Sequence, residues 1–279
     1  MRELPAQLIT ETVKRLCIEA NCHLPQDMKN CIRSSLDLET WPGAREILER
    51  IVENYEIADG ENQPICQDTG VACVFLKIGQ EVHIDGDVNE AVHEGVRQGY
   101  GEGFLRKSVV RDPLDRVNTG DNTPAFIYYE LVPGDKVEIT VAPKGFGSEN
   151  MSRIKMLRPS DGVEGVVDFV VQTVEEAGPN PCPPIVVGVG IGGTFDKAAL
   201  LAKMALLRPA DEANENPFYA ELERELLEKI NALGIGPQGL GGRTTALAVN
   251  IETMPTHIAG LPVAVNINCH VTRHQKEVL

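Results

Sequence analysis

Residues 185–194 read Ile-Val-Val-Gly-Val-Gly-Ile-Gly-Gly-Thr, an apolar run that passes into glycines and then into a helical pattern. Short β-branched runs bounded by glycine are typical of buried strands, so we expect a strand at Ile185–Val187 and a helix from Thr194 to Leu207. The glycines of Gly188–Gly193 match G-x-G-x-x-G, which between a strand and a helix is a dinucleotide-binding fingerprint. An alternative interpretation is that these glycines let the helix begin close to Cys182.

The surroundings of this motif argue against a nucleotide. No pair of parallel strands follows it, and the acidic residue that such a fold places about 20 positions later falls at Asp211-Glu212, in a polar loop. A lone match of this kind is weak evidence. An NAD-binding oxidoreductase therefore stays an alternative function.

Strand and helix patterns occur along the whole chain, with no repeat and no low-complexity linker. We expect a helical N-terminal region over residues 1–57, helices at 87–100, 161–176 and 217–233, and strands at 71–78, 82–85, 125–131, 136–141, 244–252 and 262–268. The turn Pro133-Gly134-Asp135 predicts that strands 125–131 and 136–141 form a hairpin. The predicted fold is α+β, with mixed β-sheets surrounded by α-helices in a single domain over residues 1–279.

Charge and hydropathy restrict the partners. The chain has 26 basic and 41 acidic residues and a net charge of -15, so its field repels nucleic acid and anionic membranes. No apolar run reaches the roughly 18 to 20 residues that span a bilayer, and the N-terminus lacks the apolar core of a signal peptide. We expect a cytoplasmic protein without a nucleic-acid or membrane partner.

Seven cysteines in a chain without a secretion signal indicate reduced thiols rather than a disulfide framework. Four of them lie in apolar helix or strand patterns and are expected in the core: Cys17, Cys22, Cys31 and Cys73.

The other three cysteines lie at the ends of predicted elements. Cys66 is in a turn-rich stretch before a strand, Cys182 stands among prolines that restrict the backbone, and Cys269 follows a strand. Their separations are far larger than those of ferredoxin or zinc-ribbon motifs, so only the fold can bring them together. A four-iron cluster held by three cysteines leaves one iron open to a substrate, which would suit an enzyme. An iron-sulfur electron carrier that binds no substrate is an alternative function.

Five stretches together carry a resemblance to a known family. They are Pro64-Ile-Cys-Gln-Asp-Thr-Gly70, Leu105-Arg106 with Ser108-Val-Val110, Pro143-Lys-Gly-Phe-Gly-Ser-Glu-Asn150, Pro181-Cys-Pro-Pro184, and Thr256-His-Ile-Ala-Gly-Leu-Pro262 ahead of Cys269-His270. In this order they resemble class I fumarases, either the N-terminal half of the single-chain enzymes or the alpha subunit of the split ones. Tartrate dehydratase alpha subunits are similar.

The resemblance implies a cofactor and a substrate pocket. Cys66, Cys182 and Cys269 match the ligands of a four-iron, four-sulfur (4Fe-4S) cluster with one iron that no cysteine binds. The positions that match the dicarboxylate pocket are Gln67, Asp68, Arg106, Gly147, Asn150 and His257.

The residue types suit these roles. Arg106 offers a planar fork for a carboxylate, Gly147 permits close backbone approach, and Asp68 could position water or relay a proton as the catalytic group. One departure concerns the loop around Gly147, because many single-chain relatives have a glycine where Phe146 stands. Three residues near the C-terminus have no assigned role: His270, Arg273 and His274.

By the same resemblance, we expect a hydro-lyase that reversibly hydrates fumarate to (S)-malate, with tartrate or mesaconate as alternative substrates. The family's proton-abstracting base belongs to a C-terminal domain or a separate beta subunit. We therefore expect a beta subunit as partner, in an assembly of two alpha and two beta chains.

Overall fold

The computed structural model describes all 279 residues, which form two compact units. Unit 1 comprises residues 1–25, 55–145 and 273–279, and unit 2 comprises residues 26–54 and 146–272. The chain passes between the units four times, so each unit is assembled from separate stretches and no linker divides them. The single domain expected over residues 1–279 stays a prediction.

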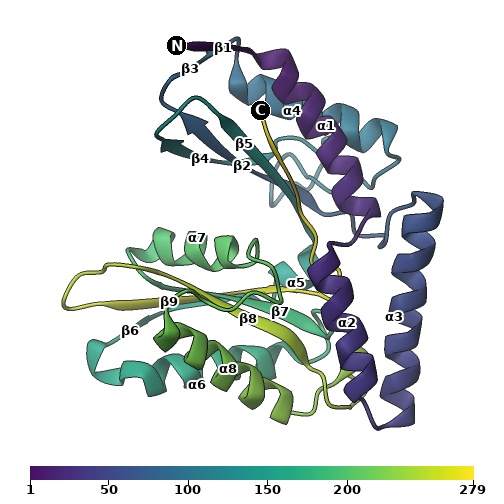
Figure 1. Ribbon diagram of the computed structural model, residues 1–279, viewed down its shortest axis with the longest axis vertical. Coiled ribbons are helices and arrows are strands. Elements are labelled where there is room, and N and C mark those ends of the chain that lie inside the picture. The colour runs from purple at the N-terminus through teal and green to yellow at the C-terminus, as the bar shows by residue number, and fades with distance from the viewer. The chain divides into compact units, whose positions relative to one another are not determined.

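Unit 1 contains helices and strands from both ends of the chain (Figure 1). Its elements are β1 (Arg2–Pro5), α1 (Ala6–Cys22), β2 (Val71–Gly79), β3 (Val82–Asp85), α4 (Val88–Glu102), β4 (Phe126–Val132), β5 (Val137–Lys144) and β10 (Gln275–Val278). Helices α1 and α4 supply apolar side chains to the core that they share with the sheet, among them Val13, Leu16 and Val96. The large sheet has the order β10-β5-β2-β4, and β1 and β3 form a separate parallel pair.

The predicted hairpin between β4 and β5 is wrong. Strand β2 lies between them, parallel to β4 and antiparallel to β5. Residues Val71–Leu76 of β2 are all buried, as is typical of a strand in the interior of a sheet whose two faces are covered. The turn at Gly134 instead accepts a hydrogen bond from Glu81 N (2.9 Å), just beyond the end of β2.

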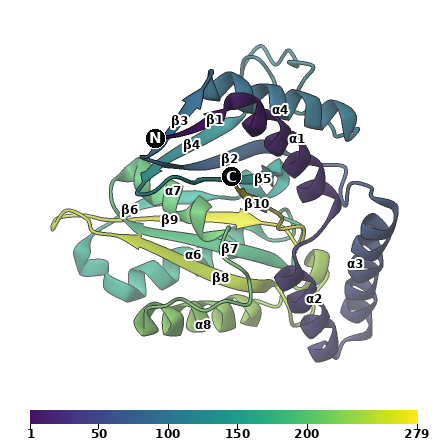
Figure 2. The ribbon, with the colours of Figure 1, turned by 45° about the horizontal axis from the view of Figure 1, so that its top comes forward.

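Unit 2 contains the second large sheet and most of the remaining helices. Its elements are α2 (Gln26–Leu38), the first part of α3 (Pro42–Glu61), α5 (Phe146–Glu149), β6 (Arg153–Leu157), α6 (Gly162–Ala177), β7 (Ile185–Gly192), α7 (Phe195–Ala205), α8 (Pro217–Ala232), β8 (Ala246–Met254) and β9 (Leu261–Asn268), with short 3-10 turns at Pro159–Asp161 and Pro237–Gly239. The sheet order is β6-β9-β7-β8, and Figure 2 shows these strands side by side. Strands β7 and β8 are parallel, whereas β9 is antiparallel to both β7 and β6.

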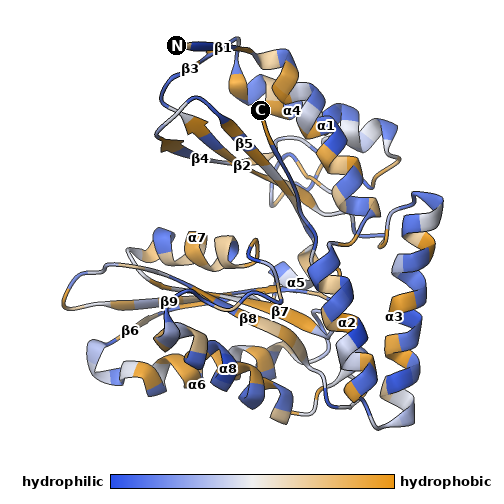
Figure 3. Ribbon diagram, in the orientation of Figure 1, coloured by the Kyte–Doolittle hydropathy of each residue, from blue (hydrophilic) through white to orange (hydrophobic).

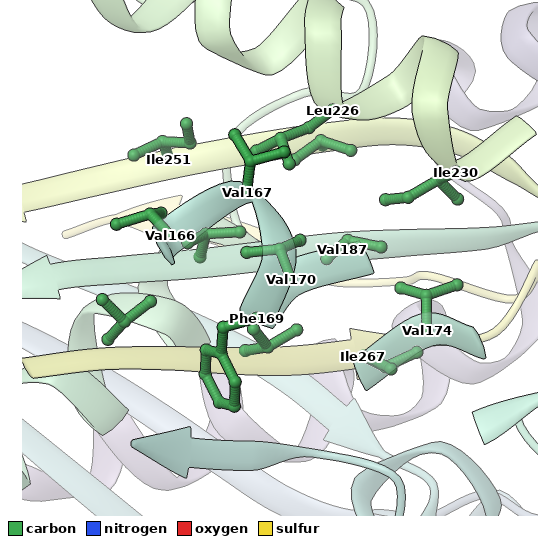
Figure 4. Close-up of a cluster of buried hydrophobic side chains, with 14 of the residues drawn as sticks. Val166, Val167, Phe169, Val170, Val174, Val187, Leu226, Ile230, Ile251 and Ile267 are labelled. Atoms are coloured by element: carbon green, nitrogen blue, oxygen red, sulfur yellow. The ribbon is translucent and has the colours of Figure 1, made fainter. Parts of the chain in front are cut away.

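Helices cover both faces of the unit 2 sheet. Helix α7 lies on one face, and α6 and α8 lie on the other (Figure 1). Val170 of α6 and Leu226 of α8 are completely buried against Val187 and Ile251 of the sheet (Figure 4). In Figure 3, α6 and α8 carry both hydrophobic and hydrophilic residues, as amphipathic helices do. This burial is the main stabilising contribution within the unit.

Two glycines of β7, Gly188 and Gly190, allow α7 to approach β7 closely. A Cβ atom at Gly188 would overlap the carbonyl oxygen of Ala202, and one at Gly190 would overlap that of Ala198. Both carbonyls belong to α7. These two glycines therefore have a packing role that requires no nucleotide.

The α+β fold class predicted from the sequence is confirmed, and most predicted elements agree with the observed ones to within a few residues. Strands β1, β6 and β10 and helix α5 were not predicted, and β1 corrects the helical region expected over residues 1–57, in which the first helix begins only at Ala6. No helix combines the length and the apolar character needed to cross a membrane.

The close contact between α7 and β7 predicts a large effect for Gly190→Ala. The added methyl group forces the helix and strand apart, so the free energy of unfolding should fall by about 3 kcal/mol. Urea denaturation of the full chain measures it. Gly60→Ala is the control, because no atom lies within 4 Å of a Cβ at Gly60 of α3, and it should change stability by less than about 1 kcal/mol. Equal effects of both changes would contradict the packing role.

Candidate functional site

The pairing of β7 with β9 brings two of the predicted cysteine ligands to one end of the unit 2 sheet. Val186, near the start of β7, pairs with Asn268 at the end of β9. Cys182 lies just before β7 and Cys269 just after β9, so the antiparallel register places both at the same end. The sequence predicted that both cysteines lie at the ends of elements, and the strand register shows that these two ends are close together.

The Cys182 loop has a fixed backbone. Cys182 has φ of +55°, a conformation that is uncommon for residues other than glycine, and its N–H donates to Pro179 O (3.0 Å). His270 Nδ1 lies 3.0 Å from Cys182 O, and because a carbonyl oxygen only accepts, Nδ1 is the donor. His270, without a role in the sequence analysis, thus joins the residue after Cys269 to the loop of Cys182.

The short helix α5 lies near both cysteine loops of unit 2. A Cβ atom built on Gly147 would be 3.7 Å from Asn180 O, two residues before Cys182. Gly147 and Asn150 are exposed at this site. The backbone at Gly147 is therefore accessible, next to the loop of Cys182.

Partly buried polar contacts join α5 to β9 and to α7. Glu149 accepts hydrogen bonds from Lys203 Nζ (2.8 Å) and Asn266 Nδ2 (2.6 Å), and Asn266 Nδ2 also lies 2.7 Å from Ser152 Oγ. Asn266 is 6% exposed and stands three residues before Cys269. Sequence reasoning missed Lys203 and Asn266, because nothing local marks partners so far from Glu149 along the chain.

The third cysteine and two pocket residues lie in unit 1, in the loop before β2. Asp68 N donates to Cys66 Sγ (3.4 Å), and Gly70 N donates to Asp68 Oδ1 (3.0 Å). These contacts orient the Asp68 carboxylate and fold the loop around the sulfur. Gln67 is exposed between them.

Arg106 is attached to the same loop of unit 1. Its N–H donates to Thr69 Oγ1 (2.9 Å), and the Thr69 hydroxyl donates to Arg106 O (3.1 Å). The side chain of Arg106 is exposed, so its guanidinium is available to an anion. Unit 1 thus brings together four of the predicted residues: Cys66, Gln67, Asp68 and Arg106.

Asp121 supports the segment that follows Arg106. Burial opposes ionisation of Asp121, but hydrogen bonds from the N–H and hydroxyl of Thr123 and from Arg97 outweigh it and lower its pKa to about 2. Next to it, Asn122 Oδ1 accepts from Ser108 N (2.7 Å), two residues beyond Arg106. The backbone that follows Arg106 is therefore held by the side chain of Asn122, which accepts from the N–H groups of Ser108 and Val109.

His257 does not join the other predicted residues of unit 2. It lies in the exposed connection between β8 and β9, where its Nδ1 accepts from Ala259 N (3.2 Å). Cys269 follows the other end of β9, eight residues long, at about 3.3 Å per residue. The length of the sheet separates His257 from Cys182 and Cys269.

The remaining cysteines are poor metal ligands, because the thiolate is the binding form. Burial raises the pKa of Cys17 to about 12 and that of Cys31 to about 11, and it also raises the pKa of Cys22. Cys73 is buried in β2, which agrees with the core positions expected for Cys17, Cys22 and Cys73, whereas Cys31 is only half-buried.

The thiols left for a metal are Cys66, Cys182 and Cys269, which are exposed or partly exposed and form no disulfide. As a donor set, three accessible thiols on constrained loops suit an iron-sulfur cluster. Nowhere does the structure gather three or more His, Cys, Asp or Glu side chains into a group that could hold a single metal ion.

Comparison with known proteins places the chain in a family. Residues 10–278 match the family described as fumarate hydratase (Fumerase). A Methanocaldococcus jannaschii protein provisionally named L(+)-tartrate dehydratase subunit alpha is 47% identical over 272 residues, which cover 95% of each chain. L(+)-tartrate dehydratase subunit alpha of Escherichia coli strain UTI89 is 36% identical, and that of Shigella sonnei is 35% identical, each over 95% of this chain and 88% of the other.

The chain belongs to the fumarate hydratase (Fumerase) family. The resemblance expected from the five motifs is thereby confirmed, and so is the enzyme class, since family and relatives are named for hydro-lyases.

The low pKa of Asp121 predicts how pH affects the loop that carries Arg106. A carboxylate whose pKa is lower in the folded chain stabilises it above pH 4, and this contribution is lost as pH falls toward 2. Asp121→Asn should lower the free energy of unfolding by about 2 kcal/mol at pH 7, with a smaller difference at pH 3. Urea denaturation at both pH values measures this, with exposed Asp115→Asn of the same loop as control. A pH-independent difference would contradict the assignment.

The contacts of Glu149 predict that it stabilises unit 2. Glu149→Gln leaves Lys203 without its carboxylate partner, and Lys203 has only 16% of its side chain exposed, so the free energy of unfolding should fall by about 2 kcal/mol. Glu225→Gln breaks an ion pair with Lys229 in which both side chains are about half exposed, and should cost less than about 0.5 kcal/mol. Chemical denaturation of both variants measures the difference, and similar losses would contradict the role of burial.

Proposed function

We propose that the chain is the alpha subunit of an iron-sulfur hydro-lyase in which Cys66, Cys182 and Cys269 hold a 4Fe-4S cluster with one iron free of cysteine. The observation that carries this proposal is the selection among the cysteines. Burial makes three of the others poor thiolates and encloses Cys73, whereas the three proposed ligands are accessible on constrained loops.

The covalent chain supports convergence of these ligands. Arg273 follows Cys269 by four residues, and its Nη2 donates to Asp68 O (2.6 Å), two residues from Cys66. The connection limits the separation of Cys269 from Cys66, whatever the arrangement of the two units.

The residues around these cysteines suit a dicarboxylate. When bound, a cluster with one such iron supplies a Lewis acid for a hydroxyl or carboxylate. The guanidinium of Arg106 can bind a carboxylate through two parallel hydrogen bonds, and the exposed Gln67 amide can donate another. The oriented Asp68 carboxylate can hold water or a proton. Gly147 and Asn150 leave room and polar groups on the unit 2 side.

His257 enters this proposal through the resemblance alone. Within one copy, the length of β9 separates it from Cys182 and Cys269. It belongs to the pocket only if another copy of the chain supplies it.

The proposed reaction is the reversible hydration of fumarate to (S)-malate. A second candidate is the dehydration of L(+)-tartrate, which the names of the relatives favour. Both substrates are four-carbon dicarboxylates, and they differ from one another in hydroxyl groups that a polar contact can read. Mesaconate, with an added methyl group, is a third substrate to test.

The proposal includes a second subunit. Three relatives are named as alpha subunits, and we propose for this chain a beta-type partner that brings the proton-abstracting base, in a cytoplasmic assembly of two alpha and two beta chains. We do not favour NAD binding, because Gly188 and Gly190 have a packing role.

Cysteine substitutions test the cluster. Cys66→Ser, Cys182→Ser and Cys269→Ser should each lose most of their iron after anaerobic reconstitution, because serine is a poor replacement for a thiolate ligand. Cys31→Ser should keep wild-type iron content and serves as the control, since Cys31 is half-buried with a raised pKa. The measurement is iron and sulfide per chain. Wild-type iron content in any ligand variant would refute that ligand.

The substrate is identified with the co-expressed partner present. The reconstituted complex should hydrate fumarate, and each ligand variant should lower the rate at least about 100-fold. The same preparation is tested with L(+)-tartrate and mesaconate. A complex that dehydrates tartrate and ignores fumarate would replace the first substrate with the second.

A further inference from the structure

The loop from Cys66 to Gly70 is held at three consecutive carbonyl groups by buried side chains. Arg273 Nη2 donates to Asp68 O (2.6 Å), and the Tyr100 hydroxyl lies within donating distance of Thr69 O (2.8 Å) and Gly70 O (3.2 Å). Arg273 is 5% exposed and Tyr100 is completely buried. Buried donors at three consecutive carbonyls restrict the conformation of the loop.

Arg273 lies close to the C-terminal end of the sequence, far from this loop along the chain. It precedes β10 by two residues, and β10 pairs with β5, starting with Gln275 opposite Val141. Beyond β10, Leu279 and Val137 exchange two backbone hydrogen bonds (2.8 and 3.1 Å). The backbone that carries Arg273 is therefore fixed on the same sheet as the loop that Arg273 contacts.

The guanidinium of Arg273 is buried, and a buried charge is costly unless it has hydrogen-bond partners. It is close enough to Cys22 and Tyr100 for its charge to oppose part of the rise in pKa that burial causes in both. A buried guanidinium that donates to a backbone carbonyl forms a charge-assisted hydrogen bond, roughly twice as strong as a neutral one. Loss of the arginine would leave Asp68 O without this donor, next to the proposed ligand Cys66.

We propose that Arg273 is a positioning residue that holds the Cys66–Gly70 loop in the conformation that presents the Cys66 sulfur and the Asp68 carboxylate. It acts through the backbone of Asp68 and has no contact with substrate in this role. The inference deepens the function proposed above and rests on it for the identity of Cys66 as a ligand. The contact itself is independent of any cluster.

Two amides of the loop report its conformation directly. Asp68 N donates to Cys66 Sγ and Gly70 N donates to Asp68 Oδ1, so both are protected only while the loop is folded as described. In the metal-free full chain, Arg273→Gln should raise the hydrogen exchange rate of a peptide covering residues 66–70 about tenfold, with little change in residues 275–278. Arg273→Lys retains a charged donor and should restore much of the protection.

Arg2→Gln is the matched control. Arg2 also donates to backbone carbonyls of unit 1, those of Asp135 and Leu279, but away from the Cys66 loop. It should leave exchange at residues 66–70 unchanged. Unchanged exchange in Arg273→Gln, or an equal rise in Arg2→Gln, would overturn the proposal. Mass spectrometry of the exchanged peptides gives the readout without any activity measurement.

A second measurement links the loop to the cluster. After anaerobic reconstitution, Arg273→Gln should lose iron to a chelator several times faster than the wild type, and Arg273→Lys should fall between them. Loosened exchange with wild-type iron retention would overturn the positioning role. If the wild-type chain binds no iron, the cluster proposal fails, and the exchange data alone decide whether Arg273 holds the loop.

Discussion

The antiparallel pairing of β7 with β9 determines what unit 2 can do. It places the start of β7 and the end of β9 at the same end of the sheet, so Cys182, three residues before β7, and Cys269, directly after β9, lie at that end although they are far apart in sequence. The same pairing places the connection between β8 and β9, which contains His257, at the opposite end of the strands. One register therefore brings two of the proposed cluster ligands to the same end of the sheet and separates them from His257, which the resemblance places in the substrate pocket.

Helix α7 packs closely on strand β7 of this sheet. Gly188 and Gly190 leave room for two carbonyls of the helix, and α7 then provides Lys203 for the carboxylate of Glu149. The glycine pattern that is typical of dinucleotide binding thus serves packing in this chain, because it lets α7, which carries Lys203, lie against β7. The polar contacts of Glu149 and Asn266 then fix the glycine-containing turn of α5.

The sequence predicted the features that depend on local pattern. Helices α4, α6 and α8 repeat apolar residues with a helical period, strands β2 and β9 are short apolar runs, and Cys17, Cys22 and Cys73 lie within such patterns. Pairing partners were harder, because a turn at Gly134 is compatible with a hairpin but does not exclude an intervening strand, and β2 is that strand. Arg273, Lys203 and Asn266 could not be found, since each acts on a residue distant in sequence and none has a local signature.

The interleaving of the two units bears on how the protein is synthesised. Strand β10 completes the sheet of unit 1, yet it is translated after all of unit 2. Until then the nascent chain carries β5 with an unpaired edge, and an unpaired edge is prone to associate with other chains. The half of the protein that contains Cys66 therefore reaches its final form only after β10 has been translated.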